Sequence, residues 1–205
     1  MSKDIKLTED EKDCLQELMN VAYGNATAAI TEILNAFAKL SIPKIQIIEA
    51  SELKNYLSNE LNLNQEHLVA LQQINGSLNG ENMFVIDKVS ATNMANKFSL
   101  TNDVIEEDDI QDITLEITNI LSSSTISKLA ENMETNVSFS APSIKLLKSI
   151  DELNNIFLSQ YEKVIIISTK LEFVDLNISG ELFILTTDNS ILFIKNKLNK
   201  ILDEL

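Results

Sequence analysis

The chain has 205 residues, 44% of them hydrophobic, which is enough to bury one substantial core or two small ones. Its 31 acidic residues outnumber 16 basic ones, and a net charge of −15 disfavours binding to nucleic acid or to an anionic membrane. The single cysteine, Cys14, excludes an internal disulfide framework, and with His67 as the single histidine the sequence contains no cluster spaced like a metal site.

Neither a membrane segment nor a signal peptide is expected. The longest apolar runs, such as Val164 to Ile167, fall far short of the ~20 residues that a spanning helix needs, and Met1 to Asp4 opens no signal peptide. We therefore expect a cytoplasmic protein whose partners are other proteins.

A long amphipathic helix is predicted to begin after Thr8. Thr8 and Glu11 fit a capping box, in which the threonine caps the helix and the glutamate reaches back to the cap. Gly24 and Asn25 interrupt the helix and predict a kink or a close packing contact. The helix should end before Pro43, because proline disfavours helical geometry in the residue ahead of it. Apolar residues recur along it at helical spacing, at Leu15, Leu18, Met19, Ala22, Ala29, Ile30, Ile33, Leu34 and Phe37.

Shorter elements are expected in the rest of the first hundred residues. Ser51 and Ser90 are interpreted as helix caps, and Asn75-Gly76 suits a tight hairpin because both residues tolerate positive φ. His67 is expected at the surface. The elements are, in order, a strand over 44–50, a short helix over 51–57, a loop over 58–66, strands over 67–74 and 78–87, and a helix over 90–98.

The sequence then repeats itself, with copies at about residues 8–100 and 108–205. The second long helix matches the first at an offset of 99, and after one inserted residue Gly80-Glu81 matches Gly180-Glu181 and Ser51 matches Asp151. We expect one α+β domain over residues 1–205, in which about six mostly antiparallel strands pack with two long helices around a pseudo-twofold axis. A half-sheet alone would leave an edge strand open, which pairing with its twin closes.

One set of residues is repeated at fixed spacing. The first copy carries Asp13, Glu17, Asn20 and Pro43, and the second carries Asp112, Glu116, Asn119 and Pro142, each displaced by 99. In each copy the aspartate, glutamate and asparagine fall on one helix stripe, within about 60° of each other, so a carboxylate and an amide lie side by side. One such triplet would be an ordinary polar face. Its repetition among altered neighbours, such as Val21–Asn25 against Ile120–Ser124, indicates a function.

This spacing resembles the motif of the CheC, CheX and FliY phosphatases of bacterial chemotaxis, in which Asp or Ser, Glu, Asn and Pro follow one another as they do here. The segment Leu18–Ala26 is similar to the family's first helix. Two intact motifs, and an end at Leu205 without a further flagellar-switch domain, make CheC types the best match. The resemblance implies hydrolysis of the phospho-aspartate of the response regulator CheY, and binding of the receptor deamidase CheD.

The resemblance also implies roles for the motif residues. Asn20 and Asn119 would position the attacking water, because an amide can hold it without the repulsion that a carboxylate meets near phosphate oxygens. Glu17 and Glu116 would dock the regulator, while Asp13, Asp112, Pro43 and Pro142 would be supporting residues. No cofactor of its own is expected, since Mg²⁺ belongs to the regulator. Ser123-Ser124 replaces Gly24-Asn25, so the two sites can differ in activity. The alternative is a non-catalytic adaptor that sequesters CheD.

Overall fold

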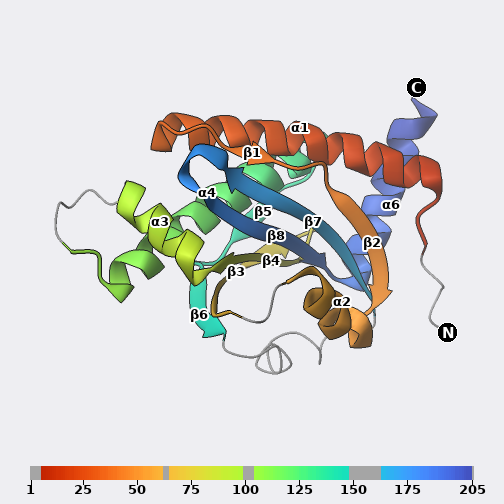
Figure 1. Cartoon of the computed structure of the whole chain (residues 1–205). Helices are drawn as coiled ribbons and strands as arrows, with labels where there is room; N and C mark the ends of the chain where they lie inside the picture. The colour runs from red at the N-terminus through yellow and green to blue at the C-terminus, as the bar shows by residue number, and fades with distance from the viewer. Residues whose placement is uncertain (1–5, 62–64, 99–103, 148–162, 205) are drawn as a thin grey trace.

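The computed structural model describes residues 6–61, 65–98, 104–147 and 163–204 (Figure 1). Two long helices lie over one face of a curled antiparallel sheet. The elements are α1 (Glu9–Leu34), β1 (Lys39–Leu40), β2 (Lys44–Glu49), η1 (Ala50–Glu52), α2 (Leu53–Glu60), β3 (His67–Gly76), β4 (Gly80–Asp87), α3 (Lys88–Phe98), α4 (Glu107–Asn132), β5 (Val137–Phe139), β6 (Ser143–Leu147), β7 (Lys163–Phe173), η3 (Val174–Leu176), β8 (Ile178–Thr186) and α6 (Asp188–Asp203).

The order of strands in the sheet repeats the duplication of the sequence. Its centre runs β7-β8-β4-β3, so the hairpin of one copy pairs antiparallel with the hairpin of the other through β4 and β8. On the outside, β1 and β2 of the first copy pair with β7 of the second, and β5 and β6 of the second pair with β3 of the first. The sheet thus has six strand positions and the expected pseudo-twofold symmetry, and each copy supplies the edge strands of the other.

Each outer edge is a strand interrupted at a proline. The breaks fall at residues 41–43, between β1 and β2, and at residues 140–142, between β5 and β6. We expected Pro43 and Pro142 to set the exit from helix into strand, but α1 has already ended at Leu34, where Asn35 takes a left-handed conformation. Because proline has no N–H to donate to a ladder, each one instead marks the break in an edge strand.

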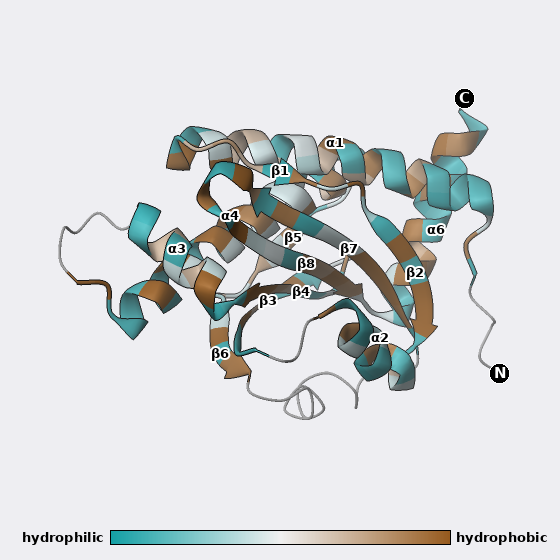
Figure 2. Cartoon of the chain, in the orientation of Figure 1, coloured by the Kyte–Doolittle hydropathy of each residue, from teal (hydrophilic) through white to brown (hydrophobic). Residues whose placement is uncertain are grey.

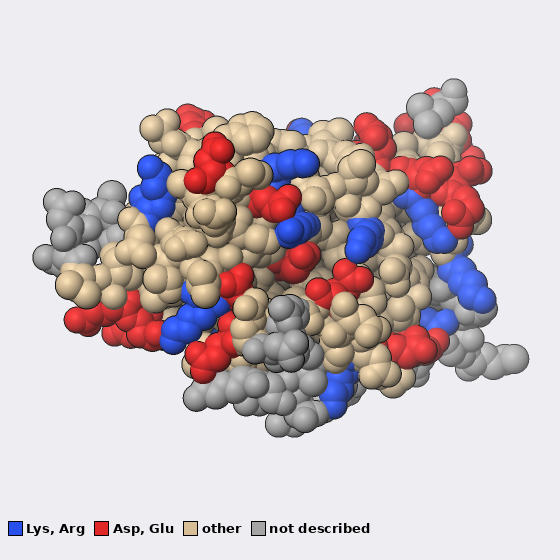
Figure 3. Space-filling model, in the orientation of Figure 1, with Lys and Arg blue, Asp and Glu red and all other residues tan. Residues whose placement is uncertain are grey.

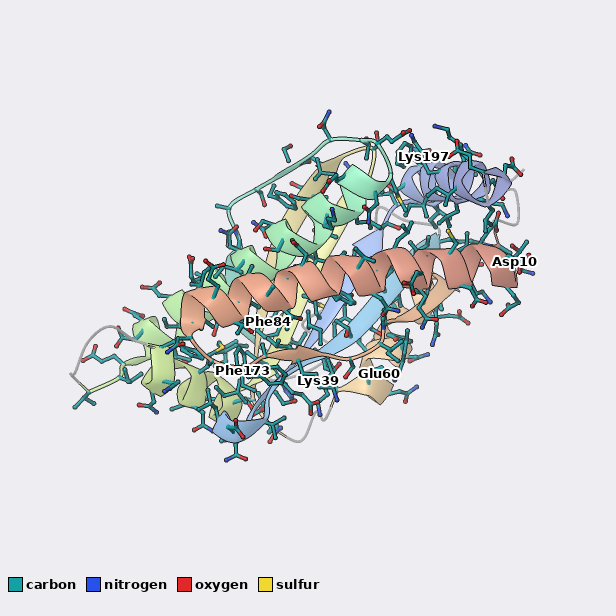
Figure 4. All side chains as sticks on the ribbon, turned by 90° about the horizontal axis from the view of Figure 1, so that it is seen from above. Asp10, Lys39, Glu60, Phe84, Phe173 and Lys197 are labelled. Carbon is teal, nitrogen blue, oxygen red and sulfur yellow. The ribbon has the colours of Figure 1, made fainter. Side chains whose placement is uncertain are left out.

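Apolar side chains on the two faces of the sheet form two cores. The larger core lies under α1 and α4 and includes Phe84 and Phe173, which Figure 4 labels on the helix side of the molecule. The smaller core lies under α2 and includes Met83 and Phe183. Figure 2 shows hydrophobic stretches in the central strands, such as the apolar run Val164–Ile167 in β7, broken by hydrophilic residues. None of the helices in the described residues combines the length and apolarity that a bilayer crossing requires.

Several local expectations were wrong. The helical segment after β2 continues to Glu60, so part of the expected loop is helix. Asp87, not Ser90, caps α3, accepting the Ser90 N–H at 2.9 Å. His67 is buried, 6% exposed, with its ring Nδ1 2.9 Å from the Gln65 carbonyl oxygen. Gly24 causes no interruption, because α1 is continuous through it and nothing lies within 4 Å of a Cβ added there. The counterpart helix expected from Asp151 lies outside the described residues.

Candidate functional site

The motif of the second copy lines a shallow depression of about 520 Å³. One wall is the exposed stripe of α4, where Glu116 and Asn119 lie one turn apart. The other wall is the break in the β5–β6 edge. The lining residues are Asp112, Leu115, Glu116, Asn119, Ala141 and Pro142. The structure therefore brings all four motif residues of this copy together, although 30 positions separate Asp112 from Pro142 in sequence.

Asn119 is hydrogen-bonded to a strand of the other copy. The Oδ1 atom of Asn119 accepts a hydrogen bond of 2.9 Å from Nε2 of Gln72, which projects from β3. The same Nε2 atom donates to the backbone carbonyl of Ser140, also at 2.9 Å. Gln72 thus joins α4 to the break that carries Pro142, and the second site contains parts of both copies.

The first copy arranges the same motif with different contacts. Asp13, Glu17 and Asn20 form an exposed stripe on α1, and Gln16 Nε2 donates to the Pro43 carbonyl at 2.9 Å. In the part of the chain that the structure describes, the Asn20 side chain has no hydrogen bond. Both asparagines are therefore exposed, but only Asn119 is fixed by a side-chain hydrogen bond within the described residues.

Glu17 also borders a groove between α1 and α6, which we call the α1–α6 groove. Its volume is about 400 Å³; its floor is mostly apolar, formed by Cys14, Leu18, Ile201 and Leu202, and its rim carries Asp10, Asp13 and Glu17. Figure 3 shows acidic side chains gathered at this end of the molecule, where α1 begins and α6 ends. Burial raises the pKa of the Cys14 thiol, which disfavours the thiolate form that a nucleophile requires.

No metal site accompanies either motif among the residues that the structure describes, since they contain no group of three potential ligands. The motif carboxylates and amides are exposed on α1 and α4.

Gln72, the residue beneath Asn119, was missed by the sequence reading. The signal was present: Leu68, Ala70, Gln72 and Ile74 share the core-facing side of one strand, and three of the four are apolar. A glutamine at a core-facing position of a strand needs a buried hydrogen-bond partner. This requirement makes Gln72 a candidate for a functional contact.

Three solved structures illustrate what the chain is similar to; no family model matches its sequence. FliY from Thermotoga maritima superposes with a TM-score of 0.74 at 19% identity, covering 95% of this chain and 98% of that one. CheX from Desulfovibrio desulfuricans gives 0.53 at 16%, covering 82% and 99%. The FliM middle domain from Vibrio alginolyticus gives 0.64 at 14%, covering 90% and 99%.

The chain has the fold of the CheC, CheX and FliY proteins. This confirms the α+β architecture predicted from the duplication. The FliM middle domain shares this fold at comparable similarity, and one fold can carry different functions. The activity of this chain therefore has to be argued from the motif residues.

Proposed function

We propose that the protein acts in chemotaxis signalling as a cytoplasmic phosphatase that hydrolyses the phospho-aspartate of a CheY-like response regulator. The observation that carries the proposal is the exposed pair of a glutamate and an asparagine, one turn apart, on each of two symmetry-related helices of a CheC-like fold. Each pair lies on a rigid element and at the surface, where a protein substrate can reach it.

The asparagine would orient the attacking water. An acyl phosphate on a regulator is already neutralised by the regulator's own Mg²⁺ and lysine, so the missing component is a water aligned with phosphorus. The Asn119 carbonyl oxygen has two acceptor positions and uses one for Gln72, which leaves the other for the water. Its amino group can donate to a phosphoryl oxygen. No covalent intermediate on this chain is required.

The glutamate would fix the register of docking. Glu17 and Glu116 are exposed and one turn from the asparagines, so either can pair with a cation on the regulator beside its phosphorylated aspartate. Removing the glutamate should therefore weaken binding, whereas removing the asparagine should slow turnover on bound regulator.

The test is loss of phosphate from a phosphorylated CheY-like regulator, measured with and without the protein. Asn20→Ala combined with Asn119→Ala should abolish the acceleration while the protein keeps a cooperative thermal unfolding transition, because both side chains are exposed and the one hydrogen bond lost among the described residues is that from Gln72 to Asn119. Turnover that survives in this folded double variant would exclude the proposed chemistry.

A second function, sequestration of another chemotaxis protein such as CheD, is favoured by the α1–α6 groove. An apolar floor with an acidic rim suits a partner that offers an apolar side chain flanked by lysine or arginine. This function predicts a complex that forms equally well with both asparagines replaced. Leu18→Asp would disrupt that complex, and a complex unaffected by it would place the contact elsewhere.

A further inference from the structure

The structure of the second site depends on a buried glutamine. Gln72 is 1% exposed, yet its Nε2 reaches two acceptors, Asn119 Oδ1 on α4 and the Ser140 carbonyl beside Pro142. The distances are both 2.9 Å, so neither contact is a weak one. Two hydrogen bonds in a packed environment restrict the Gln72 side chain to one conformation. Gln72 in turn restricts the conformation of the Asn119 side chain.

These contacts determine which way the Asn119 amide faces. A backbone carbonyl can only accept, so the Gln72 atom that faces the Ser140 oxygen must be the amino nitrogen. The second N–H of that nitrogen then points to Asn119, and the Asn119 atom that receives it must be the oxygen. The amino group of Asn119 is left facing outward. The Ser140 carbonyl thus fixes the positions of the oxygen and the nitrogen in the Asn119 side chain, and the flipped amide is excluded.

The first copy has a different residue in this place. Thr169 of β7 is the counterpart of Gln72, because its hydroxyl donates to the Ser41 carbonyl as Gln72 donates to the carbonyl of Ser140. The cross-strand neighbours agree, since Thr169 pairs with Leu182 where Gln72 pairs with Asn82. Threonine has one donor and a short side chain, and it makes no hydrogen bond to Asn20. The fold therefore forms with either residue.

Amides at these two core positions are expected to lower stability. Gln72 Oε1 and both polar atoms of Asn82, which is fully buried, find no hydrogen-bond partner among the described residues. A buried polar group without a partner is destabilising, whereas the first site uses threonine and leucine at the same positions. A feature that the fold can do without, and that costs stability, is expected where function requires it.

We infer that Gln72 is a positioning residue for Asn119, and that the second copy is the pre-organised and faster of the two phosphatase sites. The inference rests on the proposed function. In the second site the water-positioning amide is oriented before the regulator binds, whereas Asn20 must be ordered during the reaction.

The experiment isolates the second site in an Asn20→Ala background. Gln72→Met keeps the length and removes the donor, and Gln73→Met is the matched control, because Gln73 is the exposed next residue on the opposite face of β3. We expect Gln72→Met to lower kcat on phosphorylated regulator by about 10- to 100-fold with KM unchanged, because the exposed Glu116 still docks the substrate. Gln73→Met should change neither. Thermal stability should be equal or higher in Gln72→Met, an outcome opposite to that of a merely structural glutamine.

The outcomes separate the two proposals. If the parent protein lacks phosphatase activity, the proposed function fails. If the parent is active but Asn20→Ala is inactive, or if Gln72→Met turns over like its control, the function stands and the inference is overturned.

A readout without turnover tests the contact itself. Gln72 is 1% exposed and its side-chain nitrogen donates to two acceptors, so the NMR signals of its N–H groups should exchange slowly with solvent in the intact protein. In Asn119→Ala one of them loses its acceptor and should exchange faster by tenfold or more. Fast exchange of both in the parent would overturn the inference whatever the protein's activity.

Discussion

Met83 of β4 pairs directly with Phe183 of β8, its own counterpart in the second copy at an offset of 100. At the same offset, the pair of Gly80 with Thr186 corresponds to the pair of Ile86 with Gly180. The pseudo-twofold axis therefore passes between Met83 and Phe183, and both helices and both motif faces are arranged around this point of the sheet.

The two glycines near the axis should differ in their tolerance of a side chain. A Cβ on Gly80 would lie 2.0 Å from the Leu185 carbonyl oxygen, and one on Gly180 would lie 2.6 Å from the Phe84 ring. Backbone in a paired strand cannot move aside, whereas a ring can rotate slightly. We expect Gly80→Ala to lower the free energy of unfolding by about 3 kcal/mol or more, and Gly180→Ala by less. Urea unfolding of the two variants measures this; the reverse order would contradict the register of β4 and β8.

Neither copy should fold by itself, because each supplies the edge strands and the site contacts of the other. A fragment of residues 1–103 would lack the partner strands of β2, β3 and β4. We predict that each fragment alone, kept monomeric by dilution, shows no cooperative unfolding transition, and that mixing residues 1–103 with 104–205 restores one. Circular dichroism during urea titration is the measurement. A sharp transition in either monomeric fragment would show that the halves are independent.

Two half-buried glutamates, Glu81 and Glu181, should make the protein less stable as the pH rises. Burial raises the pKa of Glu81 and of Glu181 to about 7, the latter opposed by Lys170. Because the folded pKa lies above the ordinary value of 4.5, the folded state holds the extra protons, and the free energy of unfolding falls between about pH 4.5 and 7. Replacing both by glutamine should raise stability at pH 8 by about 1 to 2 kcal/mol per residue, after allowance for their partial exposure.

The control for this pair is the exposed Glu32→Gln, which should leave the pH dependence as it is. The test is urea unfolding of all three proteins between pH 4.5 and 8. Curves that remain parallel across this range would show that the two carboxyl groups ionise normally.

Glu11 should act in the opposite sense. Burial raises the pKa of this carboxyl, but the hydrogen bond of 2.7 Å from the Thr8 N–H and the Lys195 ammonium at 3.2 Å outweigh it and lower the pKa below its usual value. Its contribution is present above about pH 4.5 and is lost as the pH falls through the folded pKa. Glu11→Gln should destabilise the protein by about 2 kcal/mol at pH 7 and by progressively less in acid.

Glu9→Gln is the matched control for Glu11, because it changes an acid in the same helical turn whose side chain is 84% exposed. Its effect should stay within about 0.5 kcal/mol. Equal effects of the two substitutions would mean that the contact between α1 and α6 through Lys195 adds nothing.

The two long helices and the shared sheet were predictable because the sequence repeats. The duplication gave two equivalent helices, which the structure shows as α1 and α4 of 26 residues each, and the symmetry implied a shared sheet. The short elements were harder. Ser90 looked like a cap, but Asp87, three residues earlier, has the carboxylate that accepts its N–H. His67 looked exposed because a polar residue begins the strand, but β4 and β6 flank it on both sides.

The site itself could be predicted only in part. The stripe of Glu116 and Asn119 follows from helical periodicity, whereas the contact from Gln72 depends on pairing between β3 and β6, across more than 60 residues of sequence. An offset of 100 matches Gln72 with Glu172. Its structural counterpart is Thr169 at an offset of 97, because the turn between β7 and β8 is three residues longer than the turn between β3 and β4.

The proline breaks at the two sheet edges bear on whether copies of the protein associate with one another. An open sheet invites further strands along its edges, which leads to stacking of molecules and aggregation. Here the edge strands are short, six residues in β2 and five in β6, and a proline at the start of each removes one N–H and interrupts the ladder. We therefore expect Pro43 and Pro142 to limit edge-to-edge association of the sheet with other copies of the chain.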